Sequence, residues 1–242
     1  LLRREQHRWA DNEMQTLSVA KSIVASKVNN SRMNMMRLLR NQPGHPHEET
    51  MNYQIYQLAE IIKSIDKTEE IESLRGLEGE AANYYFSVFN HLIIRQKNDF
   101  QFKGRSRRPP KDKVNAMLSF LYTLLVFDMR SSLETVGLDP YVGFLHCDRP
   151  GRPSLALDMM EEFRAPLADR LVLSLINLKQ IQRNHFVQHG TGEVEMTEEC
   201  RKSLIVAYQN RKKELMVHPY LNEKMEIGLF FQTQARLLAR HI

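Results

Sequence analysis

The densest run of residues able to do chemistry is HCDRPGRPSLALDMMEEFR, which begins at His146. Its prolines and glycine place the histidine in a loop, with Arg149 and Arg152 beside it, and a helix follows. On that helix Asp158 and Glu161 are three positions apart, so their carboxylates lie one above the other on one face. Alone, such a pair is usually a solvated helix face, and a loop histidine is usually a surface residue.

The neighbours of Asp158 change that interpretation, because the residues around it are apolar and predict a mostly buried helix: Leu155, Leu157, Met159 and Met160. A carboxylate near the start of a buried helix needs a cation or a set of hydrogen-bond donors close to it. A metal ion would satisfy that need.

A second candidate is Glu78, which stands between Gly76 and Gly79 near the start of a predicted helix. A glycine inside a helix costs about 1 kcal/mol relative to alanine. Two of them around one carboxylate predict that something approaches the backbone closely, either a neighbouring helix or a phosphate chain. For this segment alone, tight helix packing with an exposed Glu78 is the simpler explanation.

A third candidate is the basic loop of residues 97–113. From Lys103 onward its positive side chains face only Asp112, and they are Lys103, Arg105, Arg107, Arg108, Lys111 and Lys113. Such clusters are more often solvated loops than specific sites. Beside a metal site, however, this loop becomes a candidate contact for a phosphate backbone.

The composition indicates a folded protein that can hold these groups in place. The chain has 242 residues, 42% of them hydrophobic, and its 34 Lys and Arg outnumber its 29 Asp and Glu to give a net charge of +5. This excludes intrinsic disorder. The stretch Ala116–Phe127 is too short to cross a bilayer, which needs about 20 residues, so no membrane association is expected. Cys147 and Cys200 are too few and too far apart for a disulfide framework or a structural zinc site, and a reducing, cytoplasmic location is expected.

The sequence predicts an all-α fold, a single helical domain over residues 1–242 with one small β-hairpin. Only 10 glycines and 9 prolines interrupt it. Apolar spacing predicts helices over residues 6–39 (one long helix or two in tandem), 49–64, 71–95, 114–136, 154–179, from 198 onward and at the C-terminal end. Ser154 and Thr197 are expected as N-caps and Gly137 as a C-cap, and the hairpin is expected around Gly190–Gly192.

Two histidines, His45 and His47, precede Glu48 and Glu49 and form a weaker candidate metal cluster. Pro46 and the surrounding turn residues favour an exposed loop instead.

Four motifs, in order, carry a resemblance to a known family: LRGLEG at residues 74–79, VNAMLSFLYTLL at 114–125, GFLH at 143–146 and RPGRPSLALDMMEEFR at 149–164. Together they resemble the C-terminal helical domain of the CRISPR-associated integrase, which inserts new spacers into a CRISPR array. The HCDRPGR loop is most similar to the type I-C form. Full family members begin with a β-rich N-terminal domain, which we expect to be absent from this chain.

The resemblance implies that Glu78, His146 and Glu161 bind a divalent metal ion and that Asp158 and Asn115 belong to the catalytic site. Tyr122 also matches a recurrent position near that site. Two carboxylates and one imidazole suit Mn²⁺ or Mg²⁺ and leave positions open for phosphate oxygen and water.

The same resemblance implies that Arg149 and Arg152 bind DNA phosphate. The basic loop adds further candidate DNA-binding residues through its charge: Lys103, Arg105, Arg107, Arg108 and Lys111. The expected activity is metal-dependent cleavage of DNA and joining of the 3′ ends of spacer DNA by transesterification. The nucleophile would be water or a 3′-hydroxyl.

Expected partners are double-stranded or branched DNA, a small ferredoxin-like adaptation protein, an iron–sulfur nuclease that trims DNA ends and, in the full-length form, a second copy of the chain. The main alternative is a non-catalytic helical module that binds nucleic acid. A metal hydrolase acting on small phosphoesters fits less well, because the basic charge and the arginine-rich loop suit a polymer.

Overall fold

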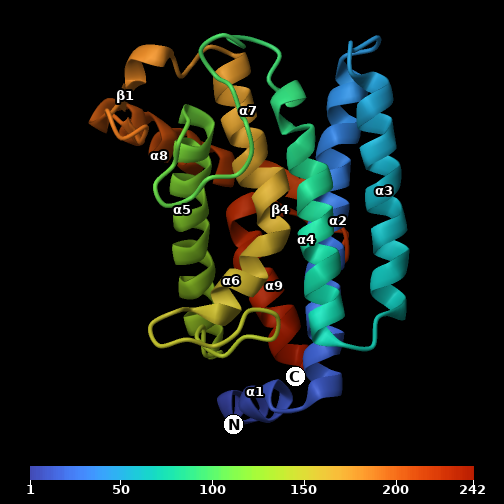
Figure 1. Ribbon diagram of the computed structural model, residues 1–242. Coiled ribbons are helices and arrows are strands. Elements are labelled where there is room, and N and C mark those ends of the chain that lie inside the picture. The colour runs from blue at the N-terminus through green and yellow to red at the C-terminus, as the bar shows by residue number, and fades with distance from the viewer.

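The computed structural model describes all residues from 1 to 242, and its elements are mainly helices (Figure 1). In the view of Figure 1, α2 and α3 form one side, α5 forms the other, and α4, α6 and α7 lie between them. Both chain termini lie at the lower end. The nine α-helices are α1 (Leu2–Ala10), α2 (Glu13–Asn41), α3 (Glu48–Lys67), α4 (Ile71–Ser87), α5 (Lys113–Val136), α6 (Ser154–Phe163), α7 (Arg170–Asn177), α8 (Glu198–Lys212) and α9 (Ile227–His241). The predicted all-α fold class is confirmed.

The first predicted helix is two helices in tandem, α1 and α2. The break falls at Asn12, whose side chain accepts a hydrogen bond from the Gln15 N–H at 3.1 Å and so caps α2. On α1 the side chain of Gln6 is fully buried. Its amide donates to the carbonyls of Asp139 and Val142, both at 2.8 Å, and thereby holds the chain that leads to His146.

The turn after α2 contains a buried histidine. His45 is only 7% exposed, and its Nδ1 accepts a hydrogen bond from the His47 N–H at 3.2 Å. The His47 ring stacks on the His91 ring with centroids 3.7 Å apart. The expectation of an exposed loop is therefore wrong for His45, because the turn packs against the short 3₁₀ helix η1 (Phe89–Leu92).

Helix α4 ends at Ser87 rather than near Arg95, and η1 follows it. The side chain of Asn90 in η1 accepts a hydrogen bond from the Phe102 N–H at 2.8 Å. The end of α4 therefore fixes the start of the basic loop.

Helix α5 lies in the core of the fold and contacts α6, α7, α8 and α9. Asp112 caps its start by accepting a hydrogen bond from the Asn115 N–H at 2.7 Å. Gly137 ends it in the left-handed conformation, with φ of 96°, as predicted. By length and composition alone α5 could cross a membrane, a test that a buried core helix also passes. Here many of its apolar side chains are buried in the core, whereas Phe127 is exposed.

The helix predicted over residues 154–179 is interrupted. Between α6 and α7 lies a π-helical turn, η2 (Arg164–Asp169), with Pro166 inside it. Proline lacks an N–H and cannot continue regular α-helical hydrogen bonding, and π-turns are common at functional sites. Ser154 is the first residue of α6 and caps nothing, so the predicted N-cap is wrong. Its hydroxyl hydrogen-bonds to the Tyr141 carbonyl instead.

The strands form two antiparallel hairpins. The predicted one consists of β1 (Phe186–Gln188) and β2 (Val194–Met196), and Thr197 caps α8 after it, as expected. A second hairpin, β3 (Leu215–Val217) with β4 (Lys224–Glu226), was not predicted. A short 3₁₀ helix, η3 (Arg183–His185), precedes β1.

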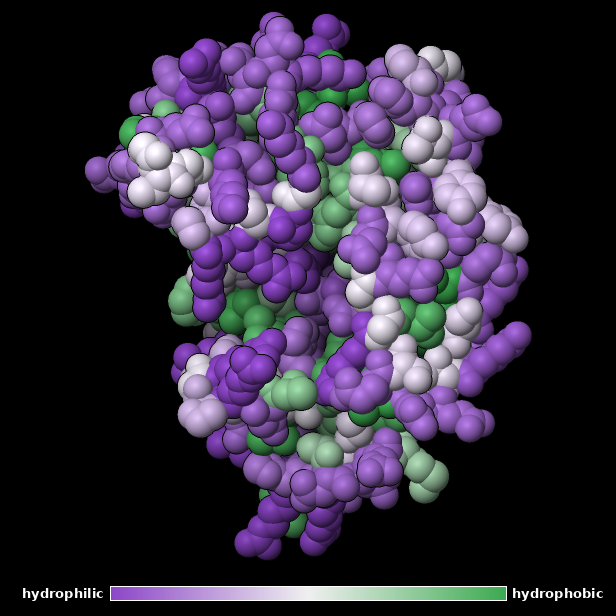
Figure 2. Space-filling model, viewed as in Figure 1, coloured by the Kyte–Doolittle hydropathy of each residue, from purple (hydrophilic) through white to green (hydrophobic).

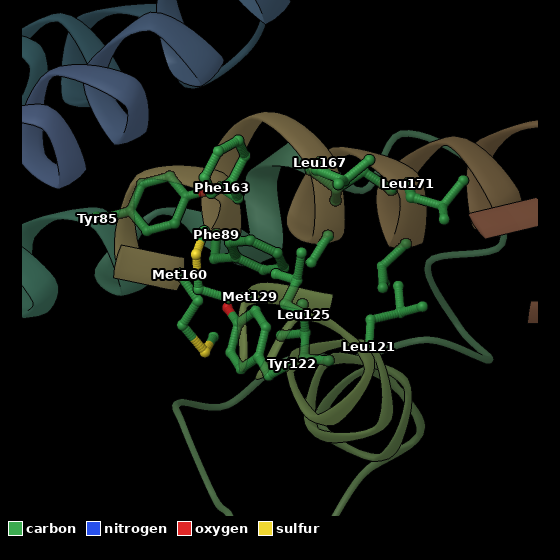
Figure 3. Close-up of a cluster of buried hydrophobic side chains, with 14 of the residues drawn as sticks. Tyr85, Phe89, Leu121, Tyr122, Leu125, Met129, Met160, Phe163, Leu167 and Leu171 are labelled. Atoms are coloured by element: carbon green, nitrogen blue, oxygen red, sulfur yellow. The ribbon is translucent and has the colours of Figure 1, made fainter. Parts of the chain in front are cut away.

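Figure 3 shows the part of the hydrophobic core that lies between α5 on one side and α6, η2 and α7 on the other. Tyr122 and Met129 of α5 face Met160 and Phe163 of α6 in this cluster, and Tyr85 of α4 closes one end of it. This core holds α4, α5 and α6 together, and these helices carry most of the expected site residues.

Candidate active site

The three expected metal ligands come from three segments and border one pocket. Glu78 lies on α4, Glu161 on α6, and His146 in the loop that precedes α6. All three line a pocket of about 460 Å³. Figure 2 shows this face of the molecule hollowed near its middle, with hydrophilic side chains bordering the hollow. The fold therefore gathers the predicted ligands, although their role in binding a metal stays a prediction.

Asp158 lies behind His146 and is fully buried. Its Oδ1 is 2.6 Å from the His146 Nδ1 and accepts the His146 N–H at 2.9 Å. Its Oδ2 accepts the N–H groups of Phe144 at 2.7 Å and Leu145 at 2.9 Å. A carboxylate that accepts a proton from Nδ1 leaves the lone pair of the imidazole on Nε2. Asp158 is therefore a positioning residue that shapes the loop and orients the ring.

Two further residues fix the His146 loop. A Cβ atom at Gly143 would lie 2.8 Å from Asp158 Oδ2 and 2.9 Å from the backbone carbon of Ser154, so only glycine allows the loop to pack this closely on α6. From α4, Arg75 donates to the Leu145 carbonyl through Nε at 3.0 Å and Nη2 at 2.7 Å. Arg75 thereby ties the histidine loop to the helix that carries Glu78.

The carboxylate of Glu161 is almost fully buried and has two cationic partners. Arg164 Nη1 lies 2.7 and 2.9 Å from its two oxygens, and Lys27 Nζ of α2 lies 2.8 Å from Oε2. Burial alone would raise the pKa of Glu161, but Arg164 and Lys27 outweigh it and lower that pKa to about 2. Lys27 also hydrogen-bonds Glu78 Oε1, so one ammonium bridges two of the predicted metal ligands.

The chemistry of these donors fits a divalent ion such as Mn²⁺ or Mg²⁺. Carboxylate oxygens are preferred ligands of both ions, and an imidazole Nε2 held by a carboxylate on Nδ1 is a common ligand arrangement. The place between Glu78 and Glu161 already attracts a cation, since Lys27 occupies it. As they stand, the side chains do not form a closed metal cage. An ion would need Lys27 to move.

A buried hydrogen-bond network lies beneath Glu161. Asp169 at the end of η2 accepts the hydroxyls of Tyr122 at 2.5 Å and Tyr85 at 3.0 Å. The Arg164 guanidinium stacks on the Tyr122 ring at 4.1 Å from its centre. Burial, followed by the charge of Asp169, raises the pKa values of both tyrosines, which stay neutral donors. The network holds Arg164 in position to pair with Glu161.

The seven predicted DNA-binding residues separate into two groups. Four of them line the pocket: Arg105, Arg107, Arg108 and Arg152. The other three are exposed outside it: Lys103, Lys111 and Arg149. The pocket is therefore rimmed by positive charge from both loops, which suits a phosphate-bearing ligand.

Asn115 anchors the basic loop. Its Oδ1 accepts from Arg105 Nη1 at 2.5 Å and from the Ser106 N–H at 3.1 Å, and its Nδ2 donates to the Gly104 carbonyl at 2.8 Å. It is fully buried and does not line the pocket. Its contacts support a positioning role for the side chain, while its catalytic role stays a prediction.

The two glycines around Glu78 face open space. A Cβ atom at either Gly76 or Gly79 would meet nothing within 4 Å. The hypothesis that a neighbouring helix packs there is therefore wrong. An approach by a phosphate chain remains compatible with this open face.

Sequence reasoning did not single out Lys27 or assign roles to Arg164 and Asp169. Lys27 could have been noticed, because it falls within the apolar stripe of α2, between the buried residues Val24 and Val28. A lysine in such a stripe needs an anionic partner. Its partners lie on α4 and α6, and the pattern of α2 carries no information about them.

Comparison with known proteins bears on the identity of this chain. A model of the family described as CRISPR associated protein Cas1 matches residues 1–210. The chain is 52% identical over its whole length to CRISPR-associated endonuclease Cas1 1 of Chlorobaculum tepidum, of which it covers 71%. It is 48% identical over 99% of its length to CRISPR-associated endonuclease Cas1 of Leptospira interrogans, of which it covers 94%. A Cas4/endonuclease Cas1 fusion from Rhodospirillum rubrum is 37% identical, and the chain covers 41% of it.

Solved structures of similar fold cover nearly the whole chain. A Cas1 protein from Thermotoga maritima superposes with a TM-score of 0.79 at 27% identity, over 98% of this chain and 69% of that one. A Cas6-RT-Cas1–Cas2 complex matches with a TM-score of 0.82 at 26% identity, over 97% of this chain and 24% of that one. A casposase bound to integration product shares the fold, with a TM-score of 0.85 at 20% identity, over 99% of this chain and 67% of that one. The chain belongs to the Cas1 family of CRISPR adaptation integrases.

Proposed function

We propose that this chain is the catalytic helical domain, over residues 1–242, of a metal-dependent DNA endonuclease and integrase that joins the 3′ ends of new spacer DNA into a CRISPR array by transesterification. The observation that carries the proposal is the single pocket bordered by Glu78, His146 and Glu161 and rimmed by arginines. Relatives named as CRISPR-associated endonucleases support it. The open face over Gly76 and Gly79 adds room for a DNA strand.

In this proposal Glu78, His146 and Glu161 hold the divalent ion, Mn²⁺ or Mg²⁺. When bound, the ion supplies Lewis-acid polarisation of a phosphate oxygen and neutralises charge that develops on the phosphate. Asp158 keeps the Nδ1 proton of His146 directed at itself, so that Nε2 faces the ligand position. Arg164 keeps Glu161 ionised through a two-oxygen ion pair.

The arginines at the rim bind and orient the DNA backbone. Arg107, Arg108 and Arg152 line the pocket, where each guanidinium can bind a phosphate through two hydrogen bonds. Arg105 is held by Asn115 and stacks on Tyr122, so its contribution is a fixed positive charge. Lys103, Lys111 and Arg149 extend the positive surface outside the pocket.

The partners follow from the same proposal. We infer a small ferredoxin-like adaptation protein, an iron–sulfur nuclease that trims DNA ends and a second copy of the chain in the full-length form. The Cas6-RT-Cas1–Cas2 complex and the Cas4/endonuclease Cas1 fusion among the similar proteins support the first two. Double-stranded or branched DNA is the inferred substrate.

The test is cleavage and 3′-end joining of a branched DNA with an overhang, titrated with Mn²⁺ and stopped with EDTA. Glu161→Gln should lose activity by 100-fold or more. The matched control is Glu162→Gln on the next residue, whose carboxylate accepts from Gln234 at 2.8 Å and does not line the pocket. Wild-type activity in Glu161→Gln would remove Glu161 from the proposed metal ligands. DNA binding by the wild type without cleavage at any metal concentration would favour the non-catalytic binding module.

A further inference from the structure

A lysine ammonium occupies the position between two of the proposed metal ligands. Lys27 Nζ lies 2.8 Å from Glu161 Oε2 and also hydrogen-bonds Glu78 Oε1. The three side chains are only 15%, 5% and 22% exposed, in the order Lys27, Glu161 and Glu78. They come from α2, α6 and α4, so the ammonium joins three helices at one point.

The charges at this point are already balanced. Glu161 also pairs with Arg164 through both of its oxygens. Two carboxylates therefore meet two cations, and no carboxylate is left without a partner. Two buried carboxylates from separate helices would repel each other without a cation between them, so Lys27 stabilises their approach.

A divalent ion that used both carboxylates would have to take the place of this ammonium. The carboxylate oxygens bound by Lys27 are the ones that face between the two helices, and two cations cannot share that place without strong repulsion. The side chain has somewhere to go. A smaller pocket of about 170 Å³, lined by Lys27 together with Ser31, Tyr122 and Asp169, adjoins the site. A lysine side chain has a flexible four-carbon stem, so its ammonium can move into this smaller pocket.

We propose that Lys27 is an internal counter-ion that holds Glu78 and Glu161 together without metal and competes with the divalent ion for them. Metal binding then breaks both Lys27 ion pairs, so Lys27 sets the metal concentration at which the site fills. The displaced ammonium stays beside the pocket as a positive charge for a substrate phosphate. This inference rests on the proposed metal site.

The experiment measures Mn²⁺ binding to the DNA-free protein by calorimetry, with thermal unfolding measured in parallel in EDTA. Lys27→Met removes the charge and keeps the length of the side chain. It should bind Mn²⁺ at least tenfold more tightly than the wild type and should unfold at a lower temperature in EDTA. Lys27→Arg keeps the charge and should bind Mn²⁺ close to the wild-type affinity. The matched control is Lys21→Met on the same helix, whose Nζ donates to the Asp66 carbonyl at 3.0 Å, away from the site.

The outcomes separate this inference from the metal site itself. If Lys27→Met binds Mn²⁺ with unchanged or weaker affinity while Glu161→Gln abolishes binding, the metal site stands and the competition is refuted. If neither the wild type nor Lys27→Met binds Mn²⁺, both proposals fall, because the variant has removed the competing cation. Should the methionine variant not fold, Lys27→Gln gives the same comparison, since its amide can still donate to one carboxylate.

Discussion

Replacing Asp158 by asparagine tests what holds the His146 loop in place, because it exchanges one buried carboxylate oxygen for an amino group. The carboxylate accepts four hydrogen bonds, from the N–H groups of Phe144, Leu145 and His146 and from the His146 ring. Asparagine has only one acceptor oxygen in its side chain, and its amino group can only donate. Half of the present acceptor positions are therefore lost whichever way the amide turns.

The two orientations of the amide have different consequences. If its oxygen replaces Oδ1, the N–H groups of Phe144 and Leu145 both lose their acceptor. If its oxygen replaces Oδ2, the His146 N–H is left unpaired, and the new amino group can only donate to Nδ1. That donation moves the ring proton to Nε2, which can then no longer bind a metal. The second orientation is favoured, because it leaves only the His146 N–H unpaired. Its remaining hydrogen bonds are made by a neutral amide in place of a charged carboxylate.

An unpaired buried N–H costs about 1–3 kcal/mol, and the loss of charge-assisted hydrogen bonds adds roughly 1 kcal/mol. We therefore expect Asp158→Asn to lower the free energy of unfolding by about 3 kcal/mol. For a chain of this size, that corresponds to a fall in melting temperature of about 6–12 °C.

The assay is thermal unfolding followed by circular dichroism at pH 7.5 in EDTA, with Asp66→Asn, at an exposed position, as the matched control. Mn²⁺ titration of the folded variant at low temperature provides a second readout, and we expect affinity to fall at least tenfold. A melting temperature within 1 °C of the wild type would show that the hydrogen bonds accepted by Asp158 do not stabilise the His146 loop. Unchanged Mn²⁺ affinity would refute the tautomer argument.

Three further predictions concern separate parts of the molecule. Gly79→Ala should stabilise the protein by about 0.5–1 kcal/mol, because the added methyl group meets nothing and alanine favours a helix over glycine. If DNA crosses this face, the same substitution should lower the affinity for DNA. Unchanged affinity in a filter-binding assay would argue against a DNA path over Gly79. Burial, and next the neighbouring His47, lower the pKa of His45 below its usual 6.5. The unfolded state therefore takes up the proton first, so this contribution to stability is present above pH 6.5 and is lost as the pH falls below it. His45→Asn should therefore lose less melting temperature between pH 7.5 and 5.5 than the wild type, and equal losses would contradict the sign. In thiol titration of the native protein, the exposed Cys147 should react quickly. Cys200 should react only on unfolding, because burial raises the pKa of its thiol to about 12. Two fast-reacting thiols would mean that α8 does not pack as described.

Much of the fold could be predicted from local sequence, because local signals have local causes. Asp112 and Thr197 cap helices that were expected to begin beside them, and Gly137 ends α5 in a conformation that glycine adopts readily. The errors arose where tertiary contacts overrode such signals. Ser154 was expected to cap α6, but the loop beside it uses its hydroxyl. The second hairpin has exposed residues throughout β3 and no alternating pattern to reveal it.

The sequence by itself determined which side chains are available: two carboxylates and a histidine of metal-ligand type, an aspartate that had to be buried, and loops rich in arginine. Periodicity shows which face of a helix is buried, but hydrophobic burial has no direction and does not say which helix covers that face. Only the tertiary structure decided that Lys27 meets Glu78 from 51 positions away, and that Arg75 ties the loop before α6 to α4 across 70 positions. Those distant pairings depend on how α2, α4 and α6 pack together. This packing places the candidate ligands Glu78, His146 and Glu161 around the same pocket.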